Sequence, residues 1–182
     1  MPDDDEQRRL GAAGIGVAHC PSSNLILASG IAPVVAMRAA GVKVGLGVDG
    51  SSSADSASLW MEARQAMLLA KLRGGAHAGT ARMALEMATL GGAGCLGREG
   101  EIGVLAAGAV ADIAVWKLTG PSFAGALADP IEAWLRCGPV SAWHTIVNGS
   151  FVVRDGEILH PDLSHVLHSH ARHAARIQQL PR

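Results

Sequence analysis

The stretch GLGVDG, at residues 45–50, decides the fold. An apolar run begins at Val42 and ends here at an aspartate and a glycine. This is the pattern of a buried strand that stops at a turn. A second apolar run covers residues 15–19, and between the two runs lies a predicted helix, residues 33–40, that starts on proline and stops at Gly41. The order strand, helix, strand predicts βα units around a parallel sheet, so the expected fold class is α/β.

Further helices are predicted on both sides of these strands. Residues 3–13 carry acids in the first turn and arginines near the end, which suits the helix dipole. Apolar residues at helical spacing predict longer helices over residues 57–72 and 80–90. Residues 20–24 contain a proline directly after the first strand and are predicted to form a loop, because proline cannot continue a central strand.

The character of the sequence changes near residue 100. Short strands are predicted over residues 101–105 and 111–116, and IVNGSFVV at residues 146–153 is typical of a hairpin on an Asn-Gly turn. A last helix is predicted over about residues 163–179. The expected units are therefore an α/β part at residues 1–97, a β-rich part at 98–160 and a C-terminal helix at 161–182.

Composition and charge exclude several classes of protein. Apolar residues make up 49% of the 182 residues and charged residues 17%, a balance typical of a globular protein. No apolar run reaches the roughly 18 residues of a membrane helix. The net charge of −1 offers no general attraction to nucleic acid or anionic lipid. With three scattered cysteines and no apolar leader segment, the expectation is a cytoplasmic protein that binds neither nucleic acid nor membranes.

Asp49 is the main candidate for chemistry. It follows an apolar strand directly, and parallel α/β barrels build their active sites at the carboxyl ends of their strands. A carboxylate at that position can ligate a metal or accept a proton from a water bound to one. The simpler interpretation is a turn or helix-capping residue, which is the more common role of an aspartate after a strand.

Other polar residues allow two interpretations each. His19 could be a metal ligand and Cys20 a nucleophile, but Ser23 and Asn24 are natural turn and cap residues, and a cysteine before proline is usually a small buried apolar group. The predicted last helix carries paired histidines at helical spacing, a feature that suits adventitious metal binding but more simply a solvated helix surface. These histidines are His165, His168, His170 and His173.

Taken together, four segments resemble the end of the amidohydrolase superfamily barrel: VAHCPSSN at residues 17–24, GIAPV at 30–34, GLGVDG at 45–50 and EARQA at 62–66. More narrowly, they look like the branch that holds 8-oxoguanine deaminase and the hydroxyatrazine-type aminohydrolases. GVLAAGAVADI at residues 103–113 resembles the return of that superfamily to its β-sandwich domain, and the Asn-Gly and Asp-Gly turns resemble its closing hairpin.

The resemblance implies the C-terminal part of a (β/α)8 metal-dependent hydrolase barrel, with strands seven and eight in residues 1–97. Residues 98–160 would then be a segment of the small β-sandwich domain. Asp49 matches the metal-binding aspartate at the end of strand eight and would also take the proton of the attacking water. The implied cofactor is one divalent metal, Zn with Fe as the alternative. Ser23, Asn24 and Asp55 would shape the loops around the substrate.

The implied function is deamination of a purine-like heterocycle of the 8-oxoguanine or guanine type, a small-molecule substrate. A triazine dechlorinase or alkylamine hydrolase is one alternative, and a non-catalytic interaction module is another. The other ligands and acids of the family, which follow barrel strands one, five and six, cannot be placed in this sequence. We therefore expect the 182-residue chain alone to be inactive, poorly soluble or dependent on a partner, and homo-oligomerisation stays open.

Overall fold

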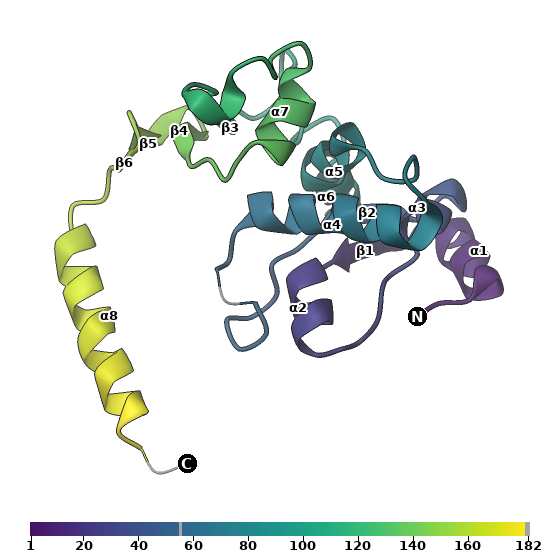
Figure 1. The fold of residues 1–182 in the computed structure, drawn as a ribbon, viewed down its shortest axis with the longest axis horizontal. Helices are drawn as coiled ribbons and strands as arrows, with labels where there is room; N and C mark the ends of the chain where they lie inside the picture. Colours follow the sequence, from purple (N-terminus) through teal and green to yellow (C-terminus); the bar gives the residue numbers. More distant parts are fainter. Residues whose placement is uncertain (55, 181–182) are drawn as a thin grey trace.

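The computed structural model describes residues 1–54 and 56–180, and its first part is built on a parallel pair of strands (Figure 1). β1 (Gly16–His19) pairs in parallel with β2 (Lys43–Leu46), and two short helices connect them, α2 (Pro21–Ile26) and α3 (Val34–Ala39). Val17 lies opposite Val44 in the register. The predicted strand–helix–strand unit is confirmed, and both strands point their carboxyl ends to the same edge of the sheet.

The helix before β1 has a strong local start signal. Asp3 caps α1 (Asp4–Ala12) by accepting the backbone N–H groups of Asp5 and Glu6, each at 2.9 Å, and the Glu6 carboxylate accepts the N–H of Asp3 at 2.9 Å. This reciprocal capping box satisfies donors that a helix start otherwise leaves unpaired. It confirms the predicted helix within one residue at each end.

After β2, a series of helices packs on the strands. It consists of α4 (Leu59–Gly74), α5 (Ala81–Glu86), η1 (Met87–Gly91) and α6 (Gly92–Cys95). The first hydrophobic core lies between these helices, α3 and the strands, and is formed by Val34, Met37, Val42, Val44, Ala66, Ala70 and Met87. The series approaches β2 so closely that a Cβ atom added at Gly91 would lie 2.2 Å from the carbonyl oxygen of Val44.

The second part of the chain contains an antiparallel sheet in the order β3 (Ile113–Trp116), β4 (Ala142–Val147), β5 (Ser150–Arg154) and β6 (Glu157–Ile158). Asn148 and Gly149 join β4 to β5 with φ of 47° and 79°. Positive φ at both central residues is the requirement of a type I′ hairpin turn, which Asn-Gly meets at low cost. The predicted hairpin is confirmed.

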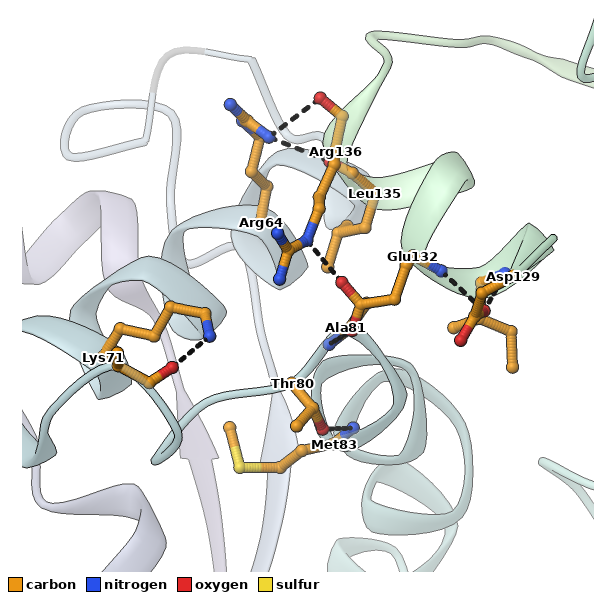
Figure 2. Close-up of polar contacts among 11 residues, drawn as sticks. Arg64, Lys71, Thr80, Ala81, Met83, Asp129, Glu132, Leu135 and Arg136 are labelled. Carbon is orange, nitrogen blue, oxygen red and sulfur yellow. Dashed lines mark hydrogen bonds and ion pairs between the residues drawn. The ribbon is translucent and has the colours of Figure 1, made fainter. Parts of the chain in front are cut away.

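Helix α7 (Pro130–Arg136), which follows the one-turn 3-10 helix η2 (Pro121–Phe123), joins the two parts. Arg64 of α4 donates to the carbonyl oxygens of Leu135 at 3.0 Å and Arg136 at 3.3 Å, and the Glu132 carboxylate accepts the N–H of Ala81 at 3.1 Å (Figure 2). Around these contacts lies a second core formed by Ala63, Met67, Ala81, Ala84, Trp134 and Leu135, with Trp60 and Trp116 at its edge. The sheet is thus anchored to the helices through α7.

The last helix, α8 (Leu163–Gln178), extends away from the rest of the chain (Figure 1). None of its residues is buried, and its side chains include Leu167, 58% exposed, and Ile177, 68% exposed. The histidines of this helix accordingly lie on a solvated surface. No helix in residues 1–54 or 56–180 has both the length and the apolar character that a bilayer crossing requires.

Two local predictions are wrong. Residues 20–24 do not form a loop, because Pro21 takes the first position of α2, where its missing N–H costs nothing. Residues 101–105 do not form a strand and contribute only an isolated bridge between Glu99 and Ile102. The β-rich part also holds a helix, α7, that was not predicted. Its start has a clear local signal, since Asp129 caps it and Pro130 follows.

Candidate active site at the strand ends

The parallel pairing of β1 and β2 brings two loops together. The N–H of Gly47 donates to the carbonyl oxygen of His19 at 2.9 Å, so the chain leaves both strands at the same edge. After β2 it reaches Asp49, and after β1 it enters α2, which carries Ser23. Residues 26 positions apart in the sequence therefore meet, and this edge is where parallel α/β folds place their chemistry.

Asp49 is exposed, yet its carboxylate is held on both oxygens. The Ser23 hydroxyl donates to Oδ2 at 2.7 Å, and the hydroxyl of Ser53 lies 3.3 Å from the same atom. The N–H of Gly50 donates to Oδ1 at 2.7 Å. The Ser23 hydrogen bond, followed by that of Gly50, lowers the pKa of Asp49 below its usual 3.8. The carboxylate is therefore ionised and oriented near neutral pH.

The backbone of Asp49 is also unusual, with φ of 58°. This left-handed conformation is uncommon for a residue with a side chain and costs free energy, although aspartate and asparagine tolerate it best. Such local strain is concentrated at functional sites, where the surrounding contacts hold it in place. Here the contacts are those of Ser23, Ser53 and Gly50.

A buried layer supports these contacts. Ser23 is itself only 3% exposed, and its hydroxyl lies 3.1 Å from that of Ser53. Its neighbour Ser22 is held by two side chains of α4: Glu62 accepts the Ser22 N–H at 2.9 Å, and Gln65 accepts the Ser22 hydroxyl at 2.9 Å. The loop and helix that carry the Asp49 contacts are thus tied to the core.

His19 is buried away from solvent, and the Cys20 thiol is not activated as a nucleophile. His19 is 4% exposed, and burial lowers the pKa of its imidazole from 6.5 to about 4, so the ring is neutral at pH 7. Burial, and then the charges of Asp49 and Glu62, raise the pKa of the Cys20 thiol. A nucleophilic cysteine needs the opposite shift, because the thiolate is the reactive form.

The remaining predicted site residues are less fully defined. Asn24 lies on α2, half-buried, with its backbone N–H donating to the carbonyl oxygen of Cys20 at 3.0 Å. Asp55 lies outside the described residues. The structure therefore brings Asp49 and Ser23 together, with Asn24 one residue further along the same helix.

The fit of these residues to a metal ion is partial. An ionised carboxylate fixed by neighbouring hydrogen bonds is a suitable ligand for a divalent metal, since such outer contacts orient ligands. Within residues 1–54 and 56–180, however, no three His, Cys, Asp or Glu side chains gather in one place. One carboxylate does not hold Zn tightly, because zinc sites use at least three protein ligands. Asp49 thus fits as one member of a ligand set, not as a complete site.

A parallel strand pair with a carboxylate just beyond its second strand is the arrangement that (β/α)8 enzymes use at the carboxyl ends of their strands. The family follows from comparison: a model described as "Amidohydrolase family" matches residues 2–152, and the chain belongs to that family. The expected fold, part of the larger amidohydrolase fold, is thereby confirmed.

Several curated relatives are similar to the chain. The 8-oxoguanine deaminase of Pseudomonas aeruginosa is 47% identical over 176 residues, which is 97% of this chain and 38% of the relative. A 5-methylthioadenosine/S-adenosylhomocysteine deaminase of Desulforudis audaxviator is 41% identical, with 92% of the chain and 39% of the relative covered. Hydroxydechloroatrazine ethylaminohydrolase of Pseudomonas sp. strain ADP is 40% identical, with 82% and 32% covered.

A solved structure agrees in fold. An adenosine deaminase from Xanthomonas campestris, with bound zinc, superposes with a TM-score of 0.91 at 27% identity. The match covers 99% of this chain and 41% of that one. The chain thus spans about two fifths of the length of the proteins it matches.

Sequence reasoning missed the support beneath Asp49. Glu62 and Gln65 belong to the EARQA segment that carried the resemblance, but no role was predicted for them. A weak signal exists: Glu62 stands four and eight residues before the core residues Ala66 and Ala70, so helical spacing places its carboxylate on the same face as these two residues. A buried charge without an assigned partner is a feature that calls for a structural role.

Proposed function

We propose that this chain supplies the last part of an aminohydrolase that removes ammonia from a purine-like heterocycle of the 8-oxoguanine or guanine type. The observation that carries the proposal is the ionised, oriented carboxylate of Asp49 at the end of β2. The 47% identity with an 8-oxoguanine deaminase over 97% of the chain supports the substrate class. In this proposal residues 1–97 contribute to the barrel, residues 98–160 to the β-sandwich, and residues 161–182 form the C-terminal helix.

In this proposal Asp49 does two things. Its carboxylate is one ligand of a divalent metal, Zn or alternatively Fe, and it accepts a proton from the attacking water. The metal supplies the Lewis acidity that makes water nucleophilic near neutral pH. Because Ser23, Ser53 and Gly50 already hold the carboxylate, it needs little reorganisation to act. The lowered pKa of Asp49 keeps it unprotonated and ready to accept a proton.

The proposed substrate residues follow the strand ends. Asn24, on α2, and Asp55 would border the ring of the substrate. The Ser23 hydroxyl donates to Asp49. Ser23 would therefore assist substrate binding indirectly, by positioning that carboxylate.

We further propose that the 182-residue chain requires more polypeptide for catalysis. Among residues 1–54 and 56–180, no three His, Cys, Asp or Glu side chains gather to hold a metal, so Asp49 has no complete ligand set there. The sheet that carries it has two strands, whereas a closed barrel of this class has eight. We expect turnover only when further strands and ligands complete the site.

A second candidate is a triazine-directed hydrolase that removes a chloride or an alkylamine. The 40% identity with hydroxydechloroatrazine ethylaminohydrolase favours this alternative. Release of ammonia from 8-oxoguanine, guanine and 5-methylthioadenosine, compared with release of alkylamine from hydroxytriazines, separates the two candidates.

The test uses the chain alone and a chimera in which it replaces the matching part of the Pseudomonas aeruginosa 8-oxoguanine deaminase. Metal content per mole is measured after desalting, together with ammonia release. We expect no stoichiometric metal in the chain alone, and about one metal with turnover in the chimera. In the chimera, Asp49→Asn should lower the metal affinity by roughly 100-fold or more, because loss of an outer contact alone can lower it that much. Asparagine tolerates positive φ, so the variant keeps the backbone.

The controls decide between outcomes. Ser51→Ala, an exposed neighbour in the same loop, should leave metal content and turnover unchanged. A chimera in which Asp49→Asn retains full metal affinity and activity would remove Asp49 from the site. One tightly held metal per mole in the chain alone would show that its ligand set is complete.

A further inference from the structure

Glu62 is a buried carboxylate that forms no ion pair with any residue in 1–54 or 56–180. It lies in the first turn of α4 and is 1% exposed, and it is the only aspartate or glutamate that is buried among residues 1–54 and 56–180. None of the ion pairs formed by these described residues includes it. Burying an unpaired carboxylate is costly, so its position calls for a compensating contact.

That contact is the backbone of α2. The Glu62 Oε2 atom accepts the N–H of Ser22 at 2.9 Å, across 40 residues of sequence. The preceding N-cap residue, Cys20, provides no side-chain cap, so the first turn of α2 takes its capping acceptor from another helix. This hydrogen bond, formed at 2.9 Å by a buried side chain, attaches the first turn of α2 to α4.

Ser23, the next residue, carries the attachment to Asp49. Its hydroxyl donates to Asp49 Oδ2 at 2.7 Å, and this bond is the main cause of the lowered pKa of Asp49. A shift of α2 by a few tenths of an ångström would lengthen this bond. The contacts thus form one connected path, from Glu62 through the backbone of α2 and the Ser23 hydroxyl to Asp49.

We propose that Glu62 is a positioning residue: it fixes the first turn of α2 so that the Ser23 hydroxyl stays on Asp49 and aims the carboxylate of Asp49. This inference rests on the proposed role of Asp49 for its functional meaning. The mechanical part, the path from Glu62 to Asp49, stands on the contacts alone and can be tested without a metal or a substrate.

The test reads the amide protons of the full chain, labelled with nitrogen-15, by NMR. The Gly50 N–H donates to Asp49 Oδ1 and therefore reports on the Asp49 carboxylate, while the Ser22 N–H reports on Glu62 itself. In Glu62→Leu, both amides should exchange with solvent faster, on the order of tenfold for Ser22, because the acceptor is gone. Glu62→Gln keeps an acceptor oxygen and should give a smaller change in the same direction.

Two matched variants separate positioning from general stability. Ser23→Ala should accelerate exchange at Gly50 as Glu62→Leu does, and combining the two should add nothing further at Gly50, since both break one path. Gln65→Leu, which removes only the partner of the Ser22 hydroxyl, should leave Gly50 unchanged. Amides of β2, such as Val44, should keep their exchange rates in all variants.

A response at Ser22 without one at Gly50 would reduce Glu62 to a helix cap and overturn the proposal. So would equal acceleration at Gly50 and Val44, which is the sign of general destabilisation. If Glu62→Leu does not fold, Glu62→Gln carries the same comparison.

Failure of this inference is distinguishable from failure of the proposed function. In the chimera, zinc affinity by chelator competition should fall with Asp49→Asn and, by a smaller factor, with Glu62→Leu. Loss with Asp49→Asn alone would keep the proposed function and reject Glu62. No loss in either variant would reject the metal role of Asp49, whatever the amides show.

Discussion

At the residue scale, His19 has the environment with the clearest consequence. Its imidazole is buried at the end of β1, and burial lowers its pKa from 6.5 to about 4. The unfolded chain therefore binds a proton at His19 below pH 6.5, whereas the folded chain does not until about pH 4. Folding excludes that proton, so His19 weakens the fold as pH falls through this window.

The first prediction follows from that difference. The free energy of unfolding should fall by roughly 3 kcal/mol between pH 6.5 and pH 4 through His19 alone. Urea unfolding across this range measures it, with His19→Gln as the control, because glutamine does not titrate. An identical slope in both proteins would show that His19 is not kept neutral by the fold.

Residue-level sequence reasoning named Asp49 and Ser23 as site candidates, and the fold brings these two side chains into contact. Asp49 was predicted from its place after an apolar strand, and the strand pairing places it there because parallel strands end together. The contact of Ser23 with Asp49 and that of Ser22 with Glu62 could not be predicted, since they span 26 and 40 positions and form only through the tertiary fold. Sequence spacing carries no information on contacts that span 40 positions.

At the scale of elements, two adjacent glycines of one helical run have opposite surroundings. Gly91 faces β2, where an added Cβ would meet the carbonyl oxygen of Val44 at 2.2 Å, while nothing lies within 4 Å of one added at Gly92. Both residues have ordinary helical φ, −62° and −60°. Of these two glycines, the close approach of the helix to the sheet therefore requires only Gly91.

The second prediction is that alanine at these two neighbouring glycines changes the free energy of unfolding in opposite directions. Gly91→Ala should destabilise the chain by about 1–3 kcal/mol, because backbone must move to admit the methyl group. Gly92→Ala should stabilise it by about 0.5–1 kcal/mol, because alanine favours a helix more than glycine does. Parallel urea titrations measure both, and destabilisation of similar size in the two variants would contradict the close approach.

Helices and turns were predictable where the local sequence carries a strong start or turn signal. The helix before β1 has its capping box, and the hairpin has its Asn-Gly turn. The prediction failed at α2, where proline was read as a break although it opens the helix, and at residues 101–105, whose strand-like composition finds no partner strand beyond one bridge. Whether an apolar stretch pairs depends on the rest of the fold, which residue type alone does not specify.

At the scale of the whole molecule, α8 contributes little to the stability of the chain as described. None of its residues is buried, and its apolar side chains Leu167 and Ile177 are more than half exposed. Side chains that remain in water add almost nothing to the hydrophobic free energy of folding. The cores of the molecule lie in the helices and strands that precede it.

The third prediction is that removal of residues 161–182 changes the free energy of unfolding by less than about 0.5 kcal/mol. Urea unfolding of the truncated and full chains measures the difference, at two protein concentrations. A loss of 2 kcal/mol or more, on the order of one large apolar side chain, would mean that α8 packs on a surface in solution. Dependence of that loss on concentration would identify the surface as another copy of the chain.

The contact between the two parts of the molecule has an optical consequence. Trp134 of α7 lies edge-on to Trp60 of α4, with ring centroids 6.5 Å apart, and 5.1 Å from Trp116 of β3. Indole rings this close exchange excitation energy, so the three tryptophans behave as coupled chromophores. Parting the sheet from the helices would uncouple them and alter near-ultraviolet circular dichroism and fluorescence together. These two tryptophan signals therefore report whether the sheet and the helices are in contact.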